Sequence, residues 1–274
     1  MSKPTISFEF FPPKTPQADE ALLDVAKALA TLDPAFMTVT FGAGGSTRDG
    51  TLKTLKAIRS VTDIPLACHL TFISLTKTEL KAYLDTLWDL GVRHVVALRG
   101  DMPKDLQWPL DPDLDYYQYT SDFIEGIKAH RPFEISVGAY PDKHPDAPDQ
   151  AADILALKKK CAAGADRAIT QFFFDHDRYD KFLKDVVAAD IKTPIVPGML
   201  PIGNYESMLK FADRCGAYVP QYVRDKFENV SAEKHAGLAE ELLLWQIDDL
   251  TKRGVKHFHF YTLNKADMLQ KILK

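Results

Sequence analysis

The chain has 274 residues, of which 46% are hydrophobic and 26% are charged, and its formal net charge is −4. This balance is typical of a globular protein that can bury a sizeable core, and it lacks the basic excess of a nucleic-acid-binding protein. No stretch approaches the roughly 18 consecutive apolar residues of a membrane helix, and the N-terminus does not resemble a secretory signal. Cys68, Cys161 and Cys215 have neither zinc-ligand nor redox spacing, so we expect reduced thiols in a cytoplasmic protein.

Short β-type runs alternate with helical stretches along the whole chain. Each run has β-branched or aromatic residues and is bounded by Pro, Gly or charged residues. The predicted strands are Ile6–Phe11, Phe36–Gly42, Pro65–Thr71, His94–Asp101, Glu134–Pro141, Arg167–Phe174, Pro194–Leu200 and Lys256–Leu263.

The intervening stretches carry helix signals. Thr15 is a predicted N-cap, and Pro16 suits the first helical position because its missing amide would have no partner there. A helix that starts near Asp149 is expected to end before Gly164, and the helix between Lys77 and Leu90 ends in the same way before a glycine.

Strict alternation predicts parallel strands joined by right-handed crossovers. We therefore expect an α/β fold, a single (β/α)8 TIM-type barrel domain over residues 1–274. The segment Tyr205–Lys252 is longer than one unit needs, which predicts extra helices before the last strand. An open doubly wound sheet is the alternative. It is weakened because Thr47 stands where the glycine-rich stretch 41–46 would need its third glycine.

Functional residues of a barrel gather where the strands end. Glu9 lies between Phe8 and Phe10, and strand alternation turns Ser7, Glu9 and Phe11 to one face. A buried carboxyl has a raised pKa, which suits a general acid at neutral pH. A Glu9 side chain paired with Arg or Lys inside the core fits the pattern equally well.

Other polar strand-end residues have two readings each. Asp101 follows a glycine and suits either a binding carboxylate or a turn; His69 and Gln171 suit either a ligand site or a satisfied core position. The run Lys158–Lys160 suits either a solvated helix face or a phosphate site. His257 and His259 have no third ligand at sensible spacing, so we expect no metal site.

Several segments taken together resemble the methylenetetrahydrofolate reductase family, in the family's order and over nearly the whole chain. They are Ser7–Pro13, Val39–Ala43, His69–Thr71, Ala97–Asp101, Ala139–Pro141 with His144–Pro145, Arg167–Phe174, Pro197–Pro201 and Phe258–Asn264. The resemblance implies a (β/α)8 barrel with FAD on its C-terminal face. It also implies hydride transfer from NADH or NADPH to flavin N5 and then to 5,10-methylenetetrahydrofolate, giving 5-methyltetrahydrofolate in one-carbon metabolism and methionine biosynthesis, or the reverse.

The resemblance also implies roles for individual residues. Glu9 is the expected catalytic acid that protonates folate N10, and Asp101 contacts the pterin near the flavin. Gln171, Phe211 and Lys265 are the other expected substrate-binding residues. The expected FAD-binding residues are Thr40, His69, Arg99, Gly100, Asp101, Tyr119, Thr120, Tyr140, His144, Asp153 and Lys160. We expect no membrane or nucleic-acid partner, and a homo-oligomer.

Some positions depart from the family pattern. Ala156 stands where a family member offers Asn to FAD, and Ser207 where a longer Gln reaches folate. The segment Pro103–Tyr116 is longer than in short bacterial members. The chain leaves no room for the regulatory domain of the eukaryotic enzymes, so we expect no control by S-adenosylmethionine.

Three other functions compete with this reading. Another FAD-dependent barrel oxidoreductase, such as a proline-dehydrogenase-like enzyme, needs a clamp of arginines, but Arg99 is the only arginine predicted at a strand end. A Schiff-base aldolase needs a lysine within a late strand, and none is visible there. A non-catalytic folate- or nucleotide-binding protein has no need for both Glu9 and Asp101.

Overall fold

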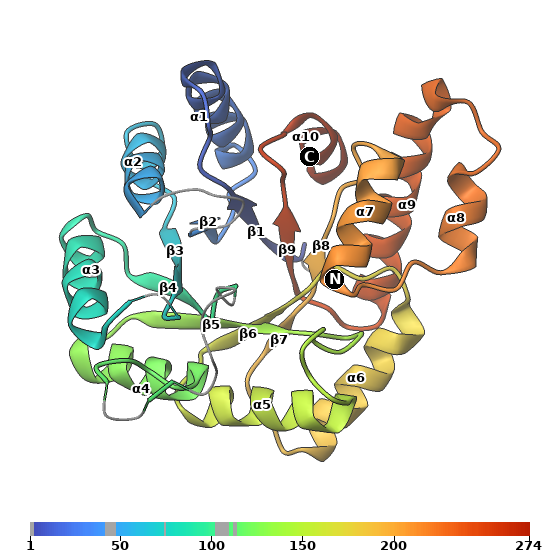
Figure 1. The fold of residues 1–274 in the computed structure, drawn as a ribbon. Helices are drawn as coiled ribbons and strands as arrows, with labels where there is room; N and C mark the ends of the chain where they lie inside the picture. Colours follow the sequence, from blue (N-terminus) through green and yellow to red (C-terminus); the bar gives the residue numbers. More distant parts are fainter. Residues whose placement is uncertain (1–2, 42–47, 74, 102–109, 112–113) are drawn as a thin grey trace.

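The computed structural model describes residues 3–41, 48–73, 75–101, 110–111 and 114–274. Within them, nine parallel strands form one sheet in the order β7-β6-β5-β4-β3-β2-β1-β9-β8. The strands are β1 Thr5–Phe10, β2 Phe36–Val39, β3 Leu66–Thr71, β4 His94–Leu98, β5 Glu134–Ala139, β6 Arg167–Thr170, β7 Ile195–Val196, β8 Gly198–Met199 and β9 His257–Tyr261. Figure 1 shows the sheet curved into a nearly closed ring with the helices outside it. The predicted α/β barrel is confirmed.

The predicted strand Pro194–Leu200 is divided into β7 and β8. β7 pairs with β6, and β8 pairs with β9, so the two short strands join the ends of the sheet. Pro197 lies between them and has no N–H to donate to a ladder. The Gly198 N–H instead donates to the Thr170 hydroxyl at 2.9 Å.

Helices cover the outside of the ring. They are α1 Pro16–Ala30, α2 Arg48–Arg59, α3 Lys77–Asp89, α4 Thr120–His130, α5 Gln150–Ala162, α6 His176–Ala188, α7 Tyr205–Cys215, α8 Gln221–Phe227, α9 Ala232–Lys252 and α10 Asp267–Leu273. The predicted cap Thr15 accepts from a backbone amide of α1, and Asp149, near which a helix was expected to start, caps α5 in the same way. The extra helices expected before the last strand are confirmed as α7, α8 and α9. Among the described residues, a helix with the length and apolarity of a membrane span is absent.

Several strands end earlier than predicted. Residues 99–101, 140–141 and 171–174 follow their strands as loop, whereas the apolar pattern extended the strands through them. Phe172, Phe173 and Phe174 are buried in this loop. Phe172 and Phe174 pack with residues of α7, α8 and α9, and the Phe173 ring stacks on Tyr179 of α6. Burial alone therefore produced the strand-like pattern. Gly42, the predicted end of the second strand, lies outside the described residues, as does the glycine-rich stretch beyond it.

The two faces of the strands differ in chemistry. Phe8 and Phe10 on β1, and Phe258 and Phe260 on β9, point outward into the core beneath the helices and are at most 1% exposed. Each such ring contributes roughly 1.5–3 kcal/mol when buried. The residues between them point into the ring, where Ser7, Glu9 and His259 make the lumen polar.

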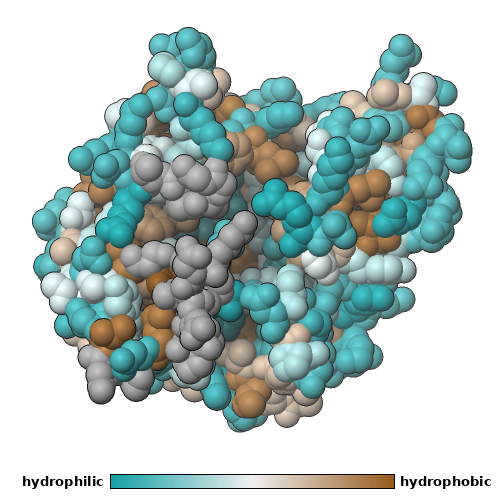
Figure 2. Space-filling model, viewed as in Figure 1, coloured by the Kyte–Doolittle hydropathy of each residue, from teal (hydrophilic) through white to brown (hydrophobic). Residues whose placement is uncertain are grey.

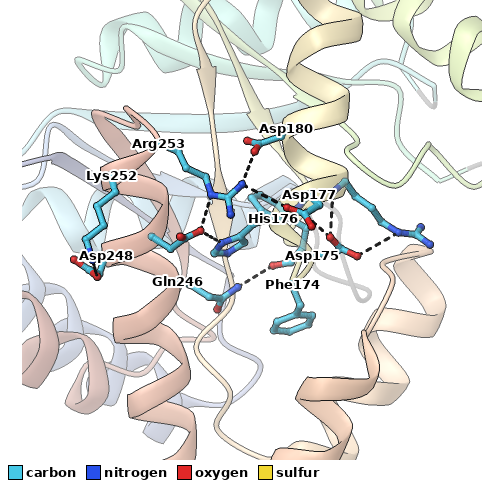
Figure 3. Close-up of polar contacts among 12 residues, drawn as sticks. Phe174, Asp175, His176, Asp177, Asp180, Gln246, Asp248, Lys252 and Arg253 are labelled. Atoms are coloured by element: carbon cyan, nitrogen blue, oxygen red, sulfur yellow. Dashed lines mark hydrogen bonds and ion pairs between the residues drawn. The ribbon is translucent and has the colours of Figure 1, made fainter.

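Helices α6 and α9 are tied together by a polar cluster (Figure 3). His176 Nδ1 lies 2.6 Å from Asp249 Oδ2, and Arg253 bonds both Asp249 and Asp180. The Gln246 amide donates to the Phe173 carbonyl at 3.1 Å, which fixes α9 to the loop after β6. Because α9 leads directly into β9, this cluster helps to position the strand that carries His259 and Tyr261.

Candidate active site

Glu9 points into the ring and meets two imidazoles. Its side chain is 19% exposed, and its Oε2 lies 3.3 Å from His69 Nε2 and 3.6 Å from His259 Nε2. Burial raises the pKa of Glu9, and the nearby His69 lowers it by less. Burial also lowers the pKa of His69, despite the opposing effect of Glu9. Both shifts favour a neutral carboxyl beside a neutral imidazole, which is the state a general acid needs.

The core-pairing alternative for Glu9 required an Arg or Lys partner. Within the described part of the chain, the ion-pairing contacts of Glu9 go to His69 and His259 instead. Burial therefore raises the pKa of Glu9 and favours its protonated form over that of a permanent counter-ion.

Two threonines of β2 and its end lie close to this pair. The Thr38 hydroxyl is 3.2 Å from His69 Nε2. The Thr40 hydroxyl oxygen is buried and has no hydrogen-bond partner among the described residues. A buried hydroxyl without a partner costs about 1–3 kcal/mol, so Thr40 is suited to bonding a ligand.

Gln171 and Tyr261 border the same end of the lumen. The Tyr261 hydroxyl donates to the Thr170 carbonyl at 2.6 Å, and burial raises its pKa well above the usual value. The side-chain oxygen of Gln171, Oε1, accepts from the backbone N–H of Phe172 at 3.0 Å.

A first cavity of about 620 Å³ opens beside the ends of β4 and β5. It brings together Arg99, Tyr119, Thr120, Tyr140, His144, Asp153 and Lys160, all predicted FAD-binding residues. Thr40, His69, Gly100 and Asp101 do not line it. Most of the predicted cofactor residues thus surround this cavity, whereas His69 contacts Glu9.

The first cavity is lined by charges of both signs. Lys160 Nζ donates to the Gly138 carbonyl at 2.5 Å, and burial lowers the pKa of this lysine. Arg99 donates to Asp146 at 2.6 Å, and Asp153 accepts from the His144 N–H at 3.0 Å. Cations suit a phosphate group, and a carboxylate suits a ribose hydroxyl.

Asp146 and Lys159 also line the first cavity. Asp146 was not predicted from the sequence, and Lys159 was considered only as part of the run Lys158–Lys160. Lys159 follows Ala152 and Ala156 at helical spacing, so the periodicity of α5 carried a usable signal. Asp146 lies in a loop, and its role depends on Arg99, 47 residues earlier. Ala156, the departure from the family pattern, lines the same wall.

The backbone conformation at position 100 explains why a glycine stands there. Its φ is +96°, and an added Cβ would lie 2.9 Å from Thr71 Cβ. Glycine is therefore required by the turn itself. Asp101 follows it and is exposed. Most of the segment Pro103–Tyr116 lies outside the described residues.

A second cavity of about 640 Å³ lies between α7, α9 and α10. Phe211 and Lys265 line it, as does Ser207, the second departure. The Phe211 ring lies 5.1 Å from the ring of Phe172. Glu9, Asp101 and Gln171 are not among its lining residues. Figure 2 shows hydrophobic side chains between the helices on this side of the molecule.

A barrel with a buried carboxyl of raised pKa and two cavities at the C-terminal ends of its strands has the architecture of an enzyme. The family model described as methylenetetrahydrofolate reductase matches residues 1–274. The chain belongs to the methylenetetrahydrofolate reductase family, and it is an oxidoreductase.

Individual relatives agree with this assignment. The 5,10-methylenetetrahydrofolate reductase of Escherichia coli is 40% identical over 265 residues, which cover 96% of this chain and 87% of that protein. Methylenetetrahydrofolate reductase (NADH) 1 of Arabidopsis thaliana is 34% identical, covering 94% of this chain and 46% of that protein. An uncharacterized protein from Clostridium thermocellum that binds 5-methyl-5,6,7,8-tetrahydrofolic acid has a TM-score of 0.66 at 15% identity, covering 98% of this chain and 93% of that chain. That likeness concerns the fold alone.

Proposed function

We propose that this chain is a FAD-dependent 5,10-methylenetetrahydrofolate reductase that uses NADH or NADPH, and that the single barrel carries the whole reaction. The observation that carries the proposal is Glu9, a buried carboxyl whose pKa is raised at the functional end of the barrel. The names of the bacterial relatives support the same substrate.

The residues present fit FAD. The Thr40 hydroxyl is buried without a partner, and the first cavity offers Lys160 and Arg99 to phosphates and Asp153 to a ribose. When bound, FAD supplies the centre that accepts hydride from the nicotinamide and delivers it to the folate. Thr40, Arg99, His144, Asp153 and Lys160 would hold it.

Glu9 acts on the folate. Opening the methylene bridge breaks the bond between the methylene carbon and N10, and the electron pair left on N10 takes the Glu9 proton. This produces an iminium at N5 and a carboxylate at Glu9. Burial raises the pKa of Glu9, which favours the protonated acid that this step needs, and His69 and His259 lie close enough to respond to the carboxylate charge.

Other residues bind the substrate in this proposal. The Asp101 charge favours the cationic iminium, and Gln171 contacts the pterin or the nicotinamide in turn. Phe211 stacks on either ligand, and Lys265 beside the second cavity attracts the carboxylates of the glutamate tail.

The test uses purified protein with added FAD under anaerobic conditions. NADH should bleach the oxidised-flavin absorbance, and 5,10-methylenetetrahydrofolate should restore it. A parallel sample receives proline in place of NADH, because a proline-dehydrogenase-like enzyme would take its electrons from that amino acid. Bleaching by proline, or reduced flavin that methylenetetrahydrofolate leaves reduced, would contradict the proposal.

A further inference from the structure

The barrel lumen holds a chain of polar side chains that runs from Glu9 toward the opposite end of β1 and β9. Ser7 lies opposite His259 in the sheet register. The Ser7 hydroxyl is 2.8 Å from His259 Nδ1 and 2.9 Å from His257 Nε2. Strand alternation turns Ser7, Glu9, His257 and His259 to the same inner face. His257 is partly exposed, whereas Ser7 and His259 are fully buried.

His259 has one nitrogen that no hydrogen bond satisfies. Its ring is 0% exposed, and its Nε2 lacks a hydrogen-bond partner among the described residues. That nitrogen lies 3.6 Å from Glu9 Oε2, slightly beyond hydrogen-bond reach. An unsatisfied buried nitrogen is costly, so its place beside the carboxyl requires an explanation.

The hydrogen-bond chain couples the tautomer of His259 to that of His257, because the Ser7 hydroxyl can donate to only one of the two rings. Burial and Arg167 hold the pKa of His259 at about 3, so the ring is neutral and carries one proton. Burial, with His259 and Arg167, holds the pKa of His257 at about 4. If His257 Nε2–H donates to Ser7, and the Ser7 hydroxyl donates to His259 Nδ1, the single proton of His259 resides on Nε2 and faces Glu9.

We propose that His259 is a positioning residue for Glu9, and that Ser7 and His257 hold it in the tautomer whose Nε2–H faces the Glu9 carboxyl. This rests on the proposed function, because it assigns His259 a part in the same proton transfer. His259 touches no reacting atom and acts only through Glu9.

The geometry explains why this contact favours the reaction. While Glu9 is protonated, the 3.6 Å separation contributes little. When Glu9 gives its proton to folate N10, the new carboxylate becomes a strong acceptor and the Nε2–H closes onto it. An interaction stronger in the transition state than in the resting state accelerates the chemical step.

Other titratable and charged groups face this interior from the neighbouring strands. His69 on β3 contacts Glu9 and Thr38, and Tyr261 on β9 lies beside them. His94 on β4 bonds Ser136 on β5 at 2.7 Å, and Arg167 on β6 is paired with Glu134. Ser136 thus makes the same kind of bond to a buried histidine without touching the Glu9 chain, which makes it a matched control for Ser7.

The kinetic test compares Ser7→Ala with Ser136→Ala. In the FAD-loaded enzyme we expect Ser7→Ala to slow flavin reoxidation by methylenetetrahydrofolate about tenfold, with flavin reduction by NADH unchanged. The pKa read from the pH profile of reoxidation should rise, because the Glu9 carboxylate loses support. Ser136→Ala should change neither rate by more than twofold. His259→Gln, which keeps an N–H donor, should retain more reoxidation activity than His259→Leu.

A second measurement does not depend on activity. Nitrogen-15 NMR of the imidazoles in the apoprotein should show the Nε2–H tautomer of His259 in the wild type and in Ser136→Ala, and a tautomer mixture in Ser7→Ala. An Nδ1–H tautomer in the wild type would overturn the inference, and so would equal reoxidation rates in the two serine variants. Failure of the wild type to reoxidise flavin with the folate would instead overturn the proposed function. If Ser7→Ala does not fold, the wild-type spectrum still decides whether His259 Nε2 carries the proton, and the comparison of His259→Gln with His259→Leu still tests the positioning role.

Discussion

At the scale of single residues, Glu9 shows how one inward-facing position acquires a function. Its strand neighbours Phe8 and Phe10 point outward and are fully buried, so they fix β1 in the barrel. The carboxyl between them is turned into the lumen, where imidazoles rather than cations surround it. Its chemistry thus follows from strand alternation and from the imidazoles that β3 and β9 supply.

The raised pKa of Glu9 predicts a pH-dependent stability. Between the pKa of the unfolded state and the raised pKa of the native state, the native state binds more protons, so the free energy of unfolding falls as the pH rises through this window. Glu9→Gln removes this dependence. We expect the variant to gain stability relative to the wild type as the pH is raised from about 5 to about 8. Denaturant unfolding of both proteins at both pH values measures the difference in their free energies of unfolding. A difference that does not change with pH would contradict the raised pKa of Glu9.

Lys160 should contribute directly to cofactor binding. We expect Lys160→Met to weaken FAD binding about 10- to 100-fold, since a hydrogen bond to a charged group is worth roughly 1.5–3 kcal/mol. Lys158→Met is the control, because Lys158 is exposed on the same helix and does not line the first cavity. Titration of the apoprotein with FAD, followed by flavin fluorescence, gives both affinities. Equal losses in the two variants would reject the specific role of Lys160.

At the scale of elements, the carboxylate of Asp249 on α9 should stabilise the contact between α6 and α9 (Figure 3). Asp249→Ala leaves the buried His176 Nδ1 without its partner, which should cost about 1–3 kcal/mol. Asp248→Ala removes only an exposed pair with Lys252 in the next helical turn, which should change stability by less than about 0.5 kcal/mol. Urea unfolding of both variants tests the difference. Equal urea midpoints for the two variants would show that the hydrogen bond between His176 and Asp249 adds nothing to stability.

The closure of the barrel depends on a glycine. A Cβ on Gly198 would lie 2.1 Å from the Thr170 carbonyl oxygen and 2.6 Å from Tyr261 Cε2, whereas a Cβ on Gly237 in α9 meets nothing within 4 Å. We expect Gly198→Ala to destabilise by about 1–3 kcal/mol, and Gly237→Ala to stabilise by up to about 1 kcal/mol. Thermal unfolding measures both. A neutral Gly198→Ala would mean that β8 shifts freely, contrary to the close packing at the junction.

At the scale of the whole molecule, the barrel itself was predictable from periodicity. Apolar and polar residues alternate in runs such as Phe8, Glu9 and Phe10, which shows that one strand face packs under the helices and the other lines the lumen. Helix caps such as Thr15 bond amides only a few residues away, so they too can be recognised from local sequence. The division at Pro197 was not predictable, because it depends on which strands lie at the two ends of the sheet. The predicted strand Arg167–Phe174 extended too far because buried loops and buried strands share an apolar composition, so the sequence pattern does not separate them.

The candidate site was predictable only in part. Arg99, His144 and Lys160 were expected from the family resemblance, and they gather around the first cavity. Asp146 and the link between His176 and Asp249 were not expected, because each depends on a partner far along the chain, 73 residues away in the second case. Spacing rules describe neighbours within an element and carry no signal for such pairs.

The role of Glu9 as the acid is tested by flavin reduction and flavin reoxidation in Glu9→Gln, each followed separately by anaerobic stopped-flow absorbance. NADH should still bleach the flavin at close to the wild-type rate, because that step needs no proton from Glu9. Reoxidation by methylenetetrahydrofolate should fall by about 10²- to 10⁴-fold, the usual contribution of a general acid. Reoxidation at the wild-type rate would contradict the claim that Glu9 protonates the folate.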